Sequence, residues 1–200
     1  PGKDDAPKKV TSYGGGFRYK IFWSPNSKKI VFIDKAMKIK MYDITNGSTT
    51  DIDQALRFMH GGCEGFAASW SHDSRWFTYS RDLGNYHNAV FIYDAQNKKN
   101  TQVTDGFYNC DNPVFDTEGK YLYLTTNQNF TPYYSDIDNS FIYGNSTQIA
   151  AIALTKATAS ILYPKNDTVA IKTEDKKKDS TKRSTSTAVE IDLDGMQTRM

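Results

Sequence analysis

The 200-residue sequence has few of the residues that mark special chemistry or a special environment. Cys63 and Cys110 are too few for a disulfide framework and lack clustered zinc partners, which favours two buried or free thiols and leaves the redox compartment open. No apolar run approaches the roughly 18 residues that cross a bilayer. The net charge of +2 argues against a dedicated nucleic-acid protein. We therefore expect neither a membrane nor a nucleic acid as partner.

Recognisable targeting signals are also missing. The first residues are polar rather than a signal peptide, and the sequence opens with Pro1 rather than an initiator methionine. We therefore expect an excised or processed segment, with any targeting signal of the parent protein out of view.

A short phrase is present twice and returns once in weaker form. It reads Trp-Ser-Pro-Asn-Ser-Lys-Lys at 23–29, Trp-Ser-His-Asp-Ser-Arg-Trp at 70–76 and Phe-Asp-Thr-Glu-Gly-Lys-Tyr at 115–121. The steps from 24 to 71 and from 71 to 116 are 47 and 45 residues, a period typical of four-stranded propeller blades. Aromatic and β-branched residues favour strands. The sequence predicts an all-β chain, a partial β-propeller of about three four-stranded blades.

Composition divides the chain further. We expect a flexible N-terminal segment over 1–16, blades over about 17–60, 61–106 and 107–163, a disordered charged linker over 164–188, and the first strand of a following blade over 189–200. The linker carries Lys, Arg and acids among Ser and Thr, with too little apolar surface to offset its ordering entropy. Residues 189–195 alternate between apolar and polar, as strands do. A long insertion over 127–147 interrupts the third blade.

Glycines and histidines do not form a convincing site in the sequence. Gly14–Gly16 lacks the Lys-Ser or Lys-Thr and the following helix of a phosphate loop. His72 replaces the proline of the repeated turn, while His60 and His87 fall in polar loops without a partner at ligand spacing. We expect no metal and no cofactor.

Catalytic residues are not expected in this chain either. Ser24 and Ser71 belong to a repeated turn, whereas a nucleophile should be singular and paired with a base. Acid pairs for glycoside chemistry would have to come from Asp105, Asp111, Asp116 or Glu118, all of which fit turns at strand ends. The basic residues within 176–183 have Asp and Glu interspersed around them and no aromatic residues, which favours a solvated linker over a nucleic-acid or membrane site.

The phrase at 23–29, followed by Ile-Val-Phe at 30–32, resembles the β-propeller repeats of tricorn-type serine peptidases. Related phrases occur in prolyl oligopeptidase-like enzymes and in the propeller of the bacterial Tol–Pal system. Residues 115–123, the insertion over 129–147 and the stretch 189–199 look specifically like the tricorn family. The resemblance covers roughly 17–163 and 189–199, and it implies a position inside one propeller, the second of the family's two.

The resemblance implies a large, oligomeric, multidomain peptidase whose Ser, His and Glu catalytic residues lie in C-terminal domains, after a PDZ-like domain. None of those motifs is in this sequence, so the chain alone should be inactive. The propeller is then expected to be a selective passage for peptide substrates, with the remaining domains of the parent as partners. The family is expected in the cytoplasm, and a signal peptide on the parent would indicate the periplasm. The alternative is a non-enzymatic propeller scaffold that binds protein partners.

Overall fold

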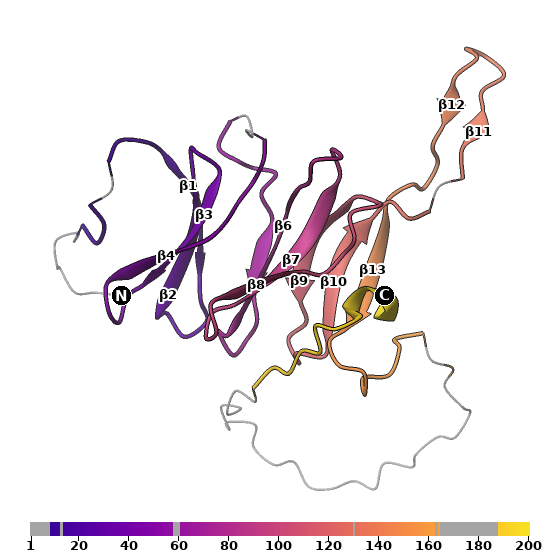
Figure 1. The fold of residues 1–200 in the computed structure, drawn as a ribbon. Helices are drawn as coiled ribbons and strands as arrows, with labels where there is room; N and C mark the ends of the chain where they lie inside the picture. Colours follow the sequence, from indigo (N-terminus) through magenta and orange to yellow (C-terminus); the bar gives the residue numbers. More distant parts are fainter. Residues whose placement is uncertain (1–8, 13, 58–60, 130, 163, 165–187) are drawn as a thin grey trace, which may run out of the picture.

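The computed structural model describes residues 9–12, 14–57, 61–129, 131–162, 164 and 188–200. In these residues the chain folds into three antiparallel sheets that stand side by side in chain order, with a small separate hairpin (Figure 1). The described part has no helix that is long and apolar enough to cross a membrane.

The sheets follow the repeats. The first has the order β1 (Arg18–Trp23), β2 (Lys29–Asp34), β3 (Lys38–Asp43) and β4 (Ser48–Gln54). The second has the order β5 (Ala68–Trp70), β6 (Trp76–Asp82), β7 (Asn88–Asp94) and β8 (Lys99–Gln102). The third pairs β9 (Cys110–Phe115) with β10 (Tyr121–Thr126), and β10 with β13 (Gln148–Ala153). These sheets form the partial propeller that the repeats predict, with two four-stranded blades and a third of three paired strands.

The insertion in the third blade forms a hairpin of its own. Strands β11 (Tyr133–Tyr134) and β12 (Phe141–Ile142) pair with each other between β10 and β13. Figure 1 shows this hairpin projecting beyond the sheets, at the far end of the third blade.

The strand predicted over 189–200 is wrong. Residues 188–193 are irregular, and a short 3-10 turn, η1 (Met196–Arg199), follows them. Val189 is held by the second blade instead, because its N–H donates to Asp73 at 2.8 Å and its carbonyl accepts from Nε1 of Trp76 at 2.9 Å. These contacts use the backbone groups that a strand ladder would need. The linker expected over 164–188 lies, apart from its two end residues, outside the described residues.

Two apolar cores lie between the sheets, because alternate strand residues point to opposite faces. Between the first and second sheets, Val31, Ile33, Ile39 and Met41 pack with Phe77, Tyr79, Phe91 and Tyr93. Between the second and third, Trp76, Val90 and Ile92 pack with Leu122, Leu124 and Ile152. The middle sheet is therefore buried on both faces, and each outer sheet on one.

Candidate functional site

The three sheets converge along their first strands, β1, β5 and β9, each of which is an edge of its sheet. Nε1 of Trp70 in β5 donates to the carbonyl of Phe22 in β1 at 3.1 Å. The N–H of Phe115 in β9 donates to Oγ of Ser69 in β5 at 3.2 Å. Strands in this position surround the central channel of a propeller. We call β1, β5 and β9 the inner edge.

Two bulges interrupt the inner edge at the same position of the repeat. Lys20 and Asn112 each lie three residues before the aromatic residue of the phrase, and both adopt the left-handed conformation, with φ of 41° and 53°. The register shifts beside each of them, and both side chains are exposed. Bulges redirect a side chain from the alternation of its strand. Lys20 donates to the Glu64 carbonyl at 2.9 Å, and Asn112 donates to Oγ1 of Thr125 at 3.0 Å.

The repeated serines hold turns, as the repetition predicts. Oγ of Ser24 accepts the N–H of Lys29, and Oγ of Ser71 accepts the N–H of Trp76, each at 2.9 Å. Each hydroxyl also donates to the acid or amide two residues further on. Both serines are buried, so neither presents a nucleophile to a substrate.

The acids considered for glycoside chemistry each have a hydrogen-bond or ion-pair partner. Asp105 and Asp116 accept backbone N–H groups within their own turns. Asp111 accepts a side-chain amide from the second blade. Glu118 pairs with Lys120 on the surface at 2.7 Å. Each carboxylate thus has a structural partner, three of them within their own turn or strand end and Asp111 across to the second blade.

The histidines and the glycine run do not build a site in the described residues. His72 lies in the repeated turn, Nδ1 of His87 lies 3.1 Å from a backbone carbonyl, and His60 is outside the described residues. In the glycine run, the carbonyl groups of Gly14 and Gly16 accept hydrogen bonds from the Arg18 guanidinium. A phosphate loop would instead direct backbone N–H groups toward an anion. Among the described residues no three His, Cys, Asp or Glu side chains gather as metal ligands would.

The two cysteines are free and buried in different cores. Burial raises the pKa of the Cys63 thiol and of the Cys110 thiol above their ordinary values. Because the thiolate is the reactive form, both behave as small apolar core residues. The structure therefore shows the two buried, free thiols that the sequence favours.

A polar network that the sequence does not reveal joins the first two blades. Asp53 in β4 accepts from the Tyr79 hydroxyl at 2.7 Å, from Nε of Arg81 at 2.7 Å and from the Asn100 amide at 3.0 Å. Burial, followed by the charge of Asp53, raises the pKa of Tyr79 far above its ordinary value, so the hydroxyl stays a donor. The donors of Tyr79, Arg81 and Asn100 thus meet at one carboxylate, which indicates a structural joint between the blades.

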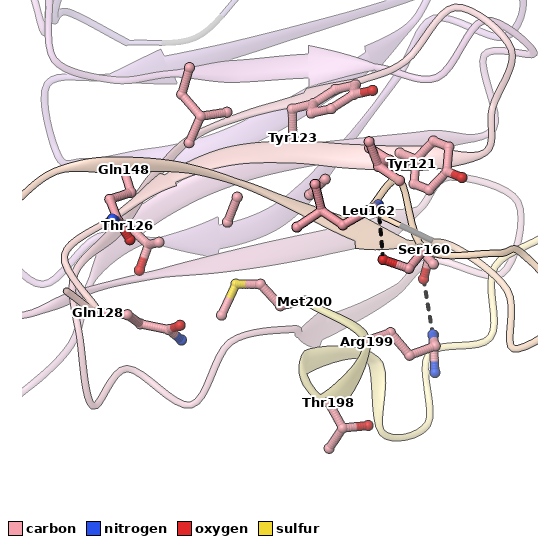
Figure 2. Close-up of a pocket in the computed structure, with 15 residues that line it drawn as sticks. Tyr121, Tyr123, Thr126, Gln128, Gln148, Ser160, Leu162, Thr198, Arg199 and Met200 are labelled. Carbon is pink, nitrogen blue, oxygen red and sulfur yellow. Dashed lines mark hydrogen bonds between the residues drawn. The ribbon is translucent and has the colours of Figure 1, made fainter. Parts of the chain in front are cut away.

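A hollow of about 610 Å³ lies beside the third sheet (Figure 2). Tyr121 and Tyr123 of β10 and residues of β13 form one side, and residues 160–162 and 198–200 form the rest. Nε of Arg199 donates to the Ala153 carbonyl at 2.9 Å and fixes η1 against β13. The lining has no carboxylate, imidazole or thiol. The hollow lies on the face of the third sheet opposite the core that this sheet shares with the second.

Comparison with known proteins adds the family. The model of the tricorn protease second beta propeller domain matches residues 2–200. The tricorn protease of Thermoplasma volcanium is 29% identical over 165 residues, which are 80% of this chain and 15% of that protein. The tricorn protease homolog of Saccharolobus solfataricus is 24% identical over 137 residues, which are 66% of this chain and 12% of that protein.

A solved structure has the same fold. A crystal structure of the tricorn protease superposes with a TM-score of 0.68 at 20% identity and covers 91% of this chain and 16% of that chain. The chain thus spans less than a sixth of the length of the curated relatives that it matches.

Proposed function

Because this chain belongs to the family of the tricorn protease second β-propeller domain, we propose that it forms part of a passage that admits peptides to a serine peptidase domain elsewhere in a longer protein. Peptide hydrolysis then takes place in that separate domain, and the 200 residues form part of the lining of the passage. The family match carries the name of a protease, and the two repeated serines of this segment are buried in turns.

The observation that carries the proposal is the inner edge. Three first strands lie side by side, and at bulges in two of them the ammonium group of Lys20 and the amide of Asn112 are exposed, each with donors beyond the one that it uses within the chain. Such groups can donate to the carbonyl groups of any peptide and so bind without sequence preference. A channel between inner strands is also too narrow for a folded protein, which makes it selective for extended chains.

The test compares long and short substrates in the full-length protein. Lys20→Trp adds bulk at the inner edge, so kcat/KM for an unfolded polypeptide should fall about tenfold while that for a blocked dipeptide is unchanged. Lys28→Trp, at an exposed position of the first turn, should change neither value. Equal effects of both variants on both substrates would contradict a passage.

A non-enzymatic scaffold is the second candidate, favoured by the exposed aromatic side chains of the β11–β12 hairpin. A full-length protein without serine-reagent-sensitive peptidase activity would support the scaffold. Hydrolysis by the isolated 200 residues would overturn both proposals, since neither places chemistry here.

A further inference from the structure

The β11–β12 hairpin has an organised tip but little support from the rest of the molecule. The N–H of Ser135 donates to the Ser140 carbonyl at 2.8 Å. Oγ of Ser135 accepts the N–H of Ile137 at 3.2 Å, and Asp138 accepts the Ser140 hydroxyl at 2.8 Å. Figure 1 shows both strands clear of the three sheets. An isolated two-stranded hairpin is marginally stable in water.

The hairpin nevertheless exposes large apolar side chains on both of its faces. Tyr134 and Phe141 stack edge-to-face across one pair, with ring centroids 5.6 Å apart, and they are 55% and 58% exposed. Tyr133 and Ile142 form the other pair, and Ile137 at the tip is 96% exposed. Exposed apolar side chains gathered on one small hairpin are typical of an interaction site.

Both strands also have an open edge. Within the described residues β11 pairs with β12 and with no other strand. The outward N–H and C=O groups can therefore pair with an added strand, and alternate side chains of that strand would contact the exposed aromatic and aliphatic groups.

The charge of this region has one sign. From 121 to 155 the sequence has no Lys, Arg or Glu, and its two acids, Asp136 and Asp138, both lie at the hairpin tip. Hydrogen bonds from Ser135 and then Ser140 lower the pKa of Asp138, so its carboxylate stays ionised at neutral pH. The tip therefore complements a cation at the end of a bound chain.

We infer that the β11–β12 hairpin binds an extended peptide as an added strand, with alternating apolar side chains on the hairpin and a basic residue beside Asp136 and Asp138. This docking surface is formed by other strands than the inner edge. The inference rests on the proposed function only if the bound peptide is a substrate of the peptidase. Added main-chain hydrogen bonds supply affinity, and the aromatic pairs and the acidic tip supply preference.

Fluorescence anisotropy tests the inference on the 200-residue chain. The probe is a labelled peptide of alternating valine and threonine residues that ends in lysine. Ile142→Ser should weaken its binding about tenfold, because an apolar contact is lost. Ile44→Ser is the matched control, since Ile44 and Ile142 are 41% and 40% exposed and Ile44 lies outside the hairpin. The control should bind as the unchanged chain does.

Two altered probes separate strand addition from unspecific adhesion. N-methylation of every residue removes the N–H donors from both edges of the peptide and should weaken binding about tenfold. Replacement of the lysine by glutamate should weaken binding to the unchanged chain and have less effect on Asp138→Asn. Circular dichroism should show the same fold for Ile142→Ser, because the hairpin is outside both cores.

Three results would overturn the inference. One is equal binding by Ile142→Ser and Ile44→Ser, and another is undiminished binding of the N-methylated peptide. The third is a dimer in light scattering that Ile142→Ser dissociates and the probe does not displace, which would assign the hairpin to a second copy. Binding is measured without hydrolysis, so a full-length protein without peptidase activity would refute the proposed passage and leave this docking surface intact.

Discussion

The buried hydroxyl of Ser71 satisfies two polar groups of the repeated turn, the N–H of Trp76 and the Asp73 carboxylate. Ser71→Ala leaves both without this partner in a site that is 0% exposed. We expect the free energy of unfolding to fall by about 1–3 kcal/mol in urea denaturation. The exposed Ser48 provides a control, since Ser48→Ala should stay within about 0.5 kcal/mol of the unchanged chain. Equal losses at both serines would contradict the role of the turn.

Gly119 takes the place of Ser74 in the third turn and has a φ of 69°. A Cβ atom there would lie 2.9 Å from both His72 and Val189, so Gly119→Ala strains the backbone and displaces the residues that tie 188–189 to the second blade. We expect a loss of about 1–3 kcal/mol in thermal denaturation. Gly84→Ala meets no atom within 4 Å and should be nearly neutral. If Gly119→Ala leaves the stability unchanged, the backbone at 119 and its contacts with His72 and Val189 can adjust without cost.

Acid should destabilise the chain partly through Asp94. Burial alone would raise the pKa of its carboxyl, but the Arg75 guanidinium and the backbone N–H groups of Asn97 and Gln96 outweigh burial and lower it. A lowered folded pKa gives stability that is present above the unfolded value, about 3.9, and is lost as the pH falls through the folded value. Asp94→Asn should therefore flatten the loss of stability below about pH 4 in urea titrations. If Asp94→Asn loses stability below about pH 4 as steeply as the unchanged chain does, Asp94 does not contribute to acid destabilisation.

At the scale of strands, the joint between the first two blades depends on one carboxylate of β4. Asp53 accepts donors from β6 and β8, whereas Asp51, in the same strand, pairs on the surface with Lys40. Asp53→Ala leaves buried donors unsatisfied and should cost about 2–4 kcal/mol in chemical denaturation. Asp51→Ala should cost less than about 1 kcal/mol. Similar costs would mean that the network adds nothing beyond an exposed ion pair.

Strands and turns were predictable from the sequence where local pattern and long-range packing agree. Ile39–Asp43 alternates and forms most of β3, and the repetition of Ser24 and Ser71 identified turns rather than nucleophiles. Residues 189–195 alternate too, yet Val189 is bound by the second blade. The Asp53 network was not predictable, because it depends on which sheet faces meet. The bulge at Lys20 shares its place in the repeat with Asn112, but its left-handed backbone is invisible in sequence.

For the whole molecule, the decisive property is that stacked sheets bury one another's faces. Trp76 and Tyr121 hold the same position in the second and third repeats. Trp76 is 4% exposed because the third sheet covers it, whereas Tyr121 lines the open hollow of Figure 2. We call the outward face of the third sheet, on which this hollow lies, the open face. Its apolar side chains occupy the positions that a neighbouring blade covers in the second sheet, so it has the composition of a surface that another blade covers.

This open face leads to a prediction about association. Ile149 in β13 is 82% exposed on the same face as Tyr123, and the outer edge of an incomplete propeller leaves backbone groups unpaired. We therefore expect the 200-residue chain to self-associate in light scattering. Ile149→Lys should lower the associated fraction severalfold without lowering the melting temperature in calorimetry, because the side chain supports no core and a buried lysine is costly. Leu56→Lys, at an exposed loop position, should leave association unchanged. A monomeric unchanged chain, or equal effects of both variants, would mean that the open face does not drive association.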